Sequence, residues 1–266
     1  RDPNLLQLCW RAADIFCSLS DNIQETFGIT PIEAMASGLP VVVSDWNGYK
    51  DTVRDGVDGF RIPTLAPPPG YSLDLAYNHA LEIDSYDMYC GYTSSLISID
   101  IDSATNAFSK LFSSSDLRRS MGANGVQNVR DRYDWQIIIP QYDSLVKELS
   151  ILRSQSHNLT PLGKRIAPQY SDPFYSFAGY PTAKFLPSTV LVLSDASFEL
   201  SRDRFQSYSC LSMINYTSRI FISDRLVYKV LQLLASDPLS CDQLADAIPE
   251  LLSERFNLFR TLAWLL

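Results

Sequence analysis

The sequence contains few of the residues that build metal centres and disulfide frameworks. Among 266 residues there are only two histidines, His79 and His157, and the five cysteines are widely spaced with no Cys-x-x-Cys pair. A histidine-rich metal site, a Ser-His-Asp triad and a thiolate zinc site therefore have few candidate residues. An odd number of separated cysteines favours a reducing compartment over a disulfide scaffold.

Long apolar runs and an excess of basic charge are also missing. No run approaches the roughly 18 apolar residues of a membrane span, and the start of the chain does not resemble a signal peptide. The net charge of −8 argues against nucleic-acid binding through bulk positive charge. The chain begins with Arg1 and ends inside an apolar run at Leu266, so we expect a piece of a longer protein.

The composition is that of a globular protein, with 46% apolar and 20% charged residues. Residues 1–150 hold 11 basic and 20 acidic side chains, whereas residues 151–266 hold 11 and 10, which suggests two units. We expect a first domain over residues 1–150 with a tyrosine-rich, one-helix insertion at 63–98. A proline-rich linker at 151–183 and a small accessory domain at 184–266 complete the predicted organisation.

The first domain alternates between strand and helix patterns. Short apolar or β-branched runs at 13–19, 39–44 and 59–62 predict strands, and helices are expected between them. This spacing predicts parallel α/β units, in which ligands bind at the carboxyl ends of the strands. Further helices are expected at 4–13, 102–113, 115–132 and 135–149, with Asp102 and Ser115 as caps of the second and third.

The accessory domain has a mixed pattern. Residues 188–193 and 207–222 suggest a small β element, and helices are predicted at 224–236, from Ser240 onward, and at 251–266. Three short helices with tight turns resemble a helix-turn-helix or winged-helix core. Because residues 222–266 hold four basic and six acidic side chains, we expect protein contacts there and no binding of nucleic acid.

The segment from Glu25 to Val42 carries the most chemical information. Thr30, Pro31 and Glu33 have the pattern of an N-cap, a first-turn proline and a capping-box glutamate. The backbone amides of residues 28–32 would then open a helix at the ligand edge of the sheet. Unpaired amides and the helix dipole together favour a phosphate group.

Two carboxylates, Glu25 and Glu33, flank this predicted phosphate site. They would repel a phosphate but accept hydrogen bonds from hydroxyls, so the arrangement fits a sugar nucleotide. Two plainer interpretations stay open, in which Glu33 only completes the capping box and Glu25 is a solvated loop residue.

The same segment resembles the retaining family-4 glycosyltransferases of the GT-B fold. The resemblance rests on two glutamates separated by seven residues and followed by Ala-Met-Ala-Ser-Gly-Leu-Pro-Val-Val. Other motifs of that family have counterparts in the same order along residues 1–150. They are Ala13–Phe16, Trp46–Gly48 with Asp51, Asp55–Phe60, Met121–Gly125 and Tyr133–Trp135.

The resemblance implies roles for individual residues. Glu33 would bind the ribose of the donor, and Glu25 would act as the catalytic residue facing the sugar ring. The backbone of Phe27, Gly28 and Ile29 would contact the sugar and the diphosphate, and Thr26 and Thr30 complete the expected donor site. The resemblance requires no metal and no cofactor besides the nucleotide-diphosphate sugar.

The resemblance also implies a wider setting. The fold would be α/β, a partial Rossmann-like parallel sheet with flanking helices, followed by the small α+β extension. The acceptor would be a glycan or a lipid-linked acceptor in cell-wall or polysaccharide synthesis, in the cytoplasm or at the inner face of the membrane. Because an N-terminal acceptor domain is missing, we expect this chain alone to be inactive; the alternative is an inactive glycosyltransferase-like binding or scaffold module.

Overall fold

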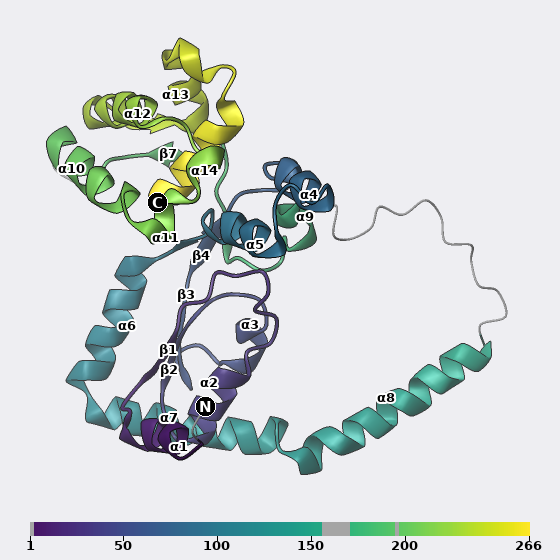
Figure 1. The fold of residues 1–266 in the computed structure, drawn as a ribbon. Helices are drawn as coiled ribbons and strands as arrows, with labels where there is room; N and C mark the ends of the chain where they lie inside the picture. The colour runs from purple at the N-terminus through teal and green to yellow at the C-terminus, as the bar shows by residue number, and fades with distance from the viewer. Residues whose placement is uncertain (1–2, 156–170, 195–196) are drawn as a thin grey trace. The chain divides into compact units, whose positions relative to one another are not determined.

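The computed structural model describes residues 3–155, 171–194 and 197–266, and these fall into two compact units (Figure 1). The first unit comprises Arg1–Ser20, Glu25–Pro63 and Asp100–Ala167, and the second comprises Asp21–Gln24, Thr64–Ile99 and Pro168–Leu266. Residues 64–99 thus fold with the C-terminal segment. The expected linear boundaries stay a prediction, and most of the expected linker lies outside the described residues.

The first unit is built on a parallel sheet, as the sequence predicts. Its strands are β1 (Phe16–Ser18), β2 (Val41–Ser44) and β3 (Gly59–Ile62), in the order β1-β2-β3. All four side chains of the central strand β2 are buried. Helices α2 (Ile29–Ala36) and α3 (Tyr49–Thr52) connect the strands. The carboxyl ends of β1 and β2 therefore lie at one edge.

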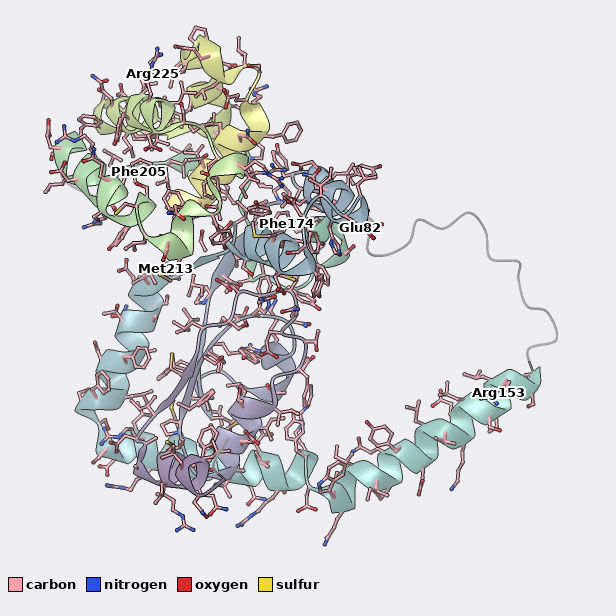
Figure 2. The ribbon with its side chains drawn as sticks, in the orientation of Figure 1. Glu82, Arg153, Phe174, Phe205, Met213 and Arg225 are labelled. Carbon is pink, nitrogen blue, oxygen red and sulfur yellow. The ribbon has the colours of Figure 1, made fainter. Side chains whose placement is uncertain are left out.

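Four further helices complete the first unit. They are α1 (Pro3–Ala12), α6 (Ile101–Ser113), α7 (Ser115–Arg132) and α8 (Trp135–Gln155). The expected caps Asp102 and Ser115 are wrong, because the side chains of Asp100 and Ser114 accept the capping hydrogen bonds. Helix α8 buries none of its residues, and Figure 2 shows Arg153 near its end.

Gly122 of helix α7 lets this helix pack closely on the end of helix α2 and the residues that follow it. A Cβ on Gly122 would lie 2.0 Å from the carbonyl oxygen of Gly38. A second anchor is the buried carboxylate of Asp58, which accepts hydrogen bonds from Arg54 Nε at 2.9 Å and from Asn128 Nδ2 at 2.9 Å. These contacts tie α7 to the loop before β3 and so fix the sheet against its helices.

The second unit begins with a small mixed sheet and two helices. Strands β4 (Thr64–Ala66), β5 (Ser98–Ile99) and β6 (Ala183–Lys184) pair in the order β5-β4-β6. The expectation of one helix in this segment is wrong, because α4 (Leu73–Ala80) and α5 (Tyr86–Ser94) form separately, the latter capped by Ser85. Tyr89 and Tyr92 are buried, whereas Tyr77 and Tyr86 are exposed.

The rest of the second unit is mainly helical. Its elements are α9 (Pro173–Ser176), β7 (Val190–Leu191), α10 (Phe198–Ser209), α11 (Ser212–Asn215), the 3-10 helix η2 (Ser218–Ile220), α12 (Asp224–Ser236), β8 (Leu239–Ser240), α13 (Cys241–Ala247), η3 (Pro249–Leu251) and α14 (Arg255–Leu265). The strand expected in 207–222 is wrong. Ser197 caps α10 through the Leu200 amide, and the buried Phe205 anchors that helix.

Helices α12, α13 and α14 surround the core of this unit. Leu244, Leu251 and Leu258 are completely buried in it. The helix expected from Ser240 onward is confirmed, and a capping box opens it: Gln243 N donates to Ser240 Oγ and Ser240 N donates to Gln243 Oε1. The antiparallel pair β7–β8 accompanies these helices. A winged-helix arrangement stays a prediction.

All five cysteines are free thiols, with Cys90 and Cys241 buried. Within residues 3–155, 171–194 and 197–266, side chains of His, Cys, Asp and Glu form no group of three that could hold a metal ion. Over the same ranges, every helix is too short or too polar to cross a membrane.

Candidate functional site

The loop from Glu25 to Gly28 is held against the turn that follows β2. Asn47 Nδ2 donates to the carbonyl oxygens of Glu25 and Thr26, at 3.1 Å each. Gly48 allows this approach, because a Cβ there would lie 2.3 Å from the carbonyl oxygen of Thr26. The side chain of Asn47 thus joins the loops that follow β1 and β2, at the edge where parallel sheets bind ligands.

Gly28 determines how the chain enters α2. Its φ of 74° lies in the left-handed region, and a Cβ would meet the ring of Tyr49 at 2.1 Å. The expected capping box of Thr30 and Glu33 is wrong. Because Gly28 lets the helix start at Ile29, Thr30 and Glu33 both lie inside it, and no side chain caps the N-terminus. Pro31 is tolerated there because first-turn amides lack helical partners.

Glu25 is positioned by a buried tyrosine. Tyr49 Oη donates to Glu25 Oε2 at 3.3 Å and forms a second hydrogen bond with Ser18 Oγ at 2.9 Å. Burial raises the pKa of Tyr49, the hydrogen bond with Ser18 opposes this, and the charge of Glu25 adds to it. The phenol therefore stays protonated and able to donate to the half-buried carboxylate of Glu25.

The other expected donor-site residues face solvent. Thr26, Ile29, Thr30 and Glu33 are exposed. Phe27 is partly covered by the ring of Tyr133, with ring centroids 6.2 Å apart. The structure joins Glu25, Thr26 and Gly28 to the β2 turn. In the part of the chain that the structure describes, no side-chain hydrogen bond links Glu33 to this loop. The assignment of these residues to a donor site stays a prediction.

A charged group formed by residues of β3 and of the segment after β2 was not found from the sequence. Arg61 Nε lies 3.3 Å from Asp45 Oδ1, and Arg61 Nη1 donates to the carbonyl oxygen of Lys50 at 2.6 Å. Burial, together with the nearby Arg61, lowers the pKa of Lys50, which Asp45 opposes. Sequence reasoning missed these residues and Tyr49 because they come from different elements and share no local motif.

Comparison with known proteins finds glycosyltransferases that are similar to the first part of the chain. Residues 2–66 match the family model of group 1 glycosyl transferases. The phosphatidyl-myo-inositol mannosyltransferase of Mycobacterium leprae is 32% identical over 132 residues, which are 49% of this chain and 25% of that protein. The alpha-1,3/1,6-mannosyltransferase ALG2 of Dictyostelium discoideum is 26% identical over 141 residues, or 53% of this chain and 25% of that protein.

A third relative matches a shorter stretch. The D-inositol 3-phosphate glycosyltransferase of Nocardia farcinica is 42% identical over 60 residues, which are 23% of this chain and 13% of that protein. No solved structure matches the chain. The family match contains β1 to β3 and the whole Glu25–Glu33 segment, and with these relatives it supports a glycosyltransferase. The chain spans about a quarter of the length of the first relatives it matches.

Proposed function

We propose that residues 1–150 are the donor-binding part of a family-4 glycosyltransferase. The complete protein would transfer a sugar from a nucleotide-diphosphate sugar to a glycan or lipid-linked acceptor, with retention at the anomeric carbon. One observation carries the proposal. The loop after β1 enters α2 through Gly28, so the first amides of α2 have no side-chain cap. Uncapped amides at a ligand edge suit a diphosphate.

In a retaining sugar transfer, each part of this loop would have its own role. As the glycosidic bond breaks, charge grows on the leaving diphosphate, and the amides of Ile29 and Thr30 would stabilise it. One such donor is worth about 2.7–4 kcal/mol in other enzymes. Glu25, held by Tyr49, would face the sugar that becomes oxocarbenium-like, and Glu33 would accept hydrogen bonds from the ribose. Thr26 and Phe27 would line the sugar site.

The wider partners are part of the same proposal. A relative named for phosphatidyl-myo-inositol favours a lipid-linked acceptor. A separate acceptor-binding domain of the same protein would supply the other wall of the active site. We propose that transfer uses neither a metal ion nor a cofactor, and takes place on the cytoplasmic side, with peripheral association to the membrane.

Calorimetric titration of the chain with GDP-mannose and UDP-glucose tests the donor site. We expect one of them to bind, and Glu33→Ala to weaken that binding at least about tenfold, equivalent to 1.4 kcal/mol. Glu33 is exposed, so its removal should leave the fold intact. Glu148→Ala, a matched change on the exposed surface of α8, should bind like the parent. Equal affinity for the parent and Glu33→Ala would refute the role of Glu33.

The alternative of an inactive module is tested separately. An inactive scaffold would bind the donor with the same Glu33 dependence but would transfer no sugar once the acceptor-binding domain is supplied. A product with the anomeric configuration of the donor would support retention, and an inverted product would overturn it.

A further inference from the structure

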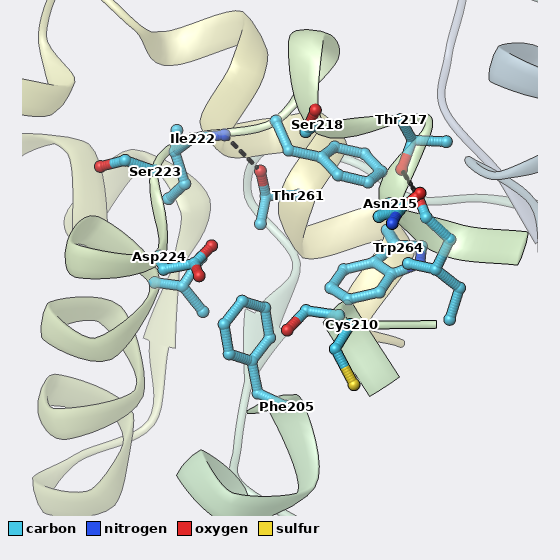
Figure 3. Close-up of a pocket in the computed structure, with 14 residues that line it drawn as sticks. Phe205, Cys210, Asn215, Thr217, Ser218, Ile222, Ser223, Asp224, Thr261 and Trp264 are labelled. Carbon is cyan, nitrogen blue, oxygen red and sulfur yellow. Dashed lines mark hydrogen bonds between the residues drawn. The ribbon is translucent and has the colours of Figure 1, made fainter. Parts of the chain in front are cut away.

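A cavity of about 480 Å³ lies inside the second unit, beside the start of α12 (Figure 3). Side chains from α10, α11, η2, α12 and α14 line it, so it lies entirely within residues 205–264. This volume falls in the range of sites for small molecules, roughly 300–1,000 Å³. The family match ends at residue 66 and does not reach the residues that line this cavity.

Aromatic rings form the apolar side of the cavity. Phe205 meets Trp264 edge to face, with ring centroids 5.9 Å apart, and Phe221 stacks on Trp264 at 5.2 Å. Figure 3 shows Asp224 to the left of the rings of Phe205 and Trp264. The rings hold one another in place, so the apolar surface is formed before any ligand arrives.

The polar groups of the cavity fall into two sets. At the floor, Thr261 Oγ1 accepts from Ile222 N at 3.0 Å and donates to the carbonyl oxygen of Asn257, and Thr217 Oγ1 donates to the carbonyl oxygen of Ile214. These hydroxyls are already used by the fold. At the exposed rim lie Asn215, Ser223 and Asp224, and Ser223 is an N-cap residue whose side chain makes no capping bond.

The charge of the lining narrows the class of ligand. No Lys, Arg or His lines the cavity, and Asp224 gives it negative charge. Phosphates, carboxylates and nucleotide sugars are therefore unfavourable ligands. An organic cation would compete through the charge of Asp224, but the other polar groups of the lining, such as Asn215 and Ser223, are neutral and suit hydroxyls. A neutral ligand with apolar and hydroxyl-bearing faces fits best.

We propose that this cavity binds a neutral carbohydrate. The C–H face of a sugar ring would pack on the partly exposed rings of Phe221 and Trp264. Its hydroxyls would donate to the carboxylate of Asp224 and exchange hydrogen bonds with Asn215 and Ser223. A hydrogen bond to an ionised carboxylate is stronger than one between neutral groups, so Asp224 is the main polar anchor. The site is independent of the proposed donor loop, because it excludes the diphosphate which that loop would bind.

The test uses the whole chain and the indole N–H resonance of Trp264, assigned with Trp264→Phe. Methyl α-mannoside, methyl α-glucoside, methyl β-galactoside and myo-inositol are titrated in turn. We expect at least one to shift this resonance with saturation. Asp224→Ala should weaken that binding at least about tenfold. Asp237→Ala removes the same charge at the other end of α12, is exposed and lies outside the cavity, so it should bind like the parent.

Each result decides the proposal. No saturable shift with any of the four ligands, in a parent that melts cooperatively, overturns it. So does binding that Asp224→Ala and Asp237→Ala weaken equally, because the carboxylate would then act only through overall charge. Saturation by tetramethylammonium in place of the sugars would identify a cation site and also refute it. Glu33→Ala should leave the sugar titration unchanged, which separates this proposal from the donor site.

Discussion

The Glu25–Gly28 loop and the cavity beside α12 are candidate sites of opposite construction. The loop is shaped by backbone contacts: an asparagine amide holds two carbonyl oxygens, and Gly28 and Gly48 sit where a Cβ would not fit. The cavity is shaped by side chains from five elements, with aromatic rings that pack on one another. The loop therefore depends on single positions, whereas the cavity depends on the folding of a whole unit.

This difference bears on what sequence comparison detects. Gly28 and Gly48 stand at positions where a Cβ would clash, and both lie within about 25 residues of Glu25. Such positions form a compact sequence pattern, and the family match covers them. The residues of the cavity are spread from Phe205 to Trp264, and each is an ordinary core or surface residue taken alone. A site of the second kind has to be found in the folded structure.

The largest effect is expected when a side chain is added to the loop at Gly28. Gly28→Ala combines a left-handed φ with a Cβ 2.1 Å from the ring of Tyr49, so we expect a loss of about 3 kcal/mol in unfolding free energy. Gly56 also has a left-handed φ, of 71°, but nothing lies within 4 Å of its Cβ position. Gly56→Ala should therefore cost only about 1–2 kcal/mol.

Urea unfolding of both variants measures the two costs. The excess of Gly28→Ala over Gly56→Ala isolates the clash with Tyr49 from the backbone strain that both share. Equal losses would mean that the loop shifts to accept a side chain, and its dependence on glycine would then be refuted. Donor titration of Gly28→Ala should also fail, because the uncapped amides follow this residue directly.

Much of the fold could be predicted because local signals agree with the packing. The β-branched run ending at Ser44 became a buried central strand, and Ser240 with Gln243 became a capping box. The start of α2 could not be predicted, since Thr30 matches an N-cap pattern but Gly28 turns the chain earlier. The strand expected in 207–222 failed because these residues form the end of α10, α11 and η2, and Tyr216 stacks on Tyr92 of α5.

The candidate site was predictable only in part for the same reason. The pattern between Glu25 and Glu33 is local and could be read directly. Tyr49 reaches Glu25 from 24 residues away in the sequence, and only the pairing of β1 with β2 brings the two together. The grouping of residues 64–99 with the C-terminal segment likewise depends on long-range strand pairing, such as Leu65 with Ala183.

A pair of cap variants compares helix starts in the two regions. Ser240 caps α13 through its side chain, so Ser240→Ala should lower the unfolding free energy of the second unit by about 1 kcal/mol. Thr30 lies inside α2 and caps nothing, so Thr30→Ala should change stability by less than about 0.5 kcal/mol. Thermal and urea unfolding measure both. A loss of stability for Thr30→Ala as large as that for Ser240→Ala would mean that Thr30 caps α2. It would contradict a start of α2 at Ile29, directly after Gly28.

The smallest expected effect concerns the hydroxyl of Tyr49. Tyr49→Phe removes its hydrogen bonds with Glu25 and Ser18, and because water can reach the half-buried Glu25, we expect a loss of about 0.5 kcal/mol at neutral pH. Ser18→Ala alone should cost a similar amount, and the double variant should cost less than the sum, since both remove one shared bond. Full additivity in this cycle would show that the Ser18–Tyr49 bond contributes nothing.

The pH dependence of the same variant gives an independent check. Burial raises the folded pKa of Tyr49 above its ordinary value of 10.0. The stability that the neutral phenol provides is therefore fully present below pH 10 and is lost as the pH rises through the folded pKa. Phenylalanine has no such loss, so the parent should be the more stable protein at neutral pH and its advantage over Tyr49→Phe should shrink above pH 10. If the difference in unfolding free energy between the parent and Tyr49→Phe stayed constant across this range, Tyr49 would be open to solvent. The Glu25–Gly28 loop would then have no buried hydrogen-bond partner in Tyr49.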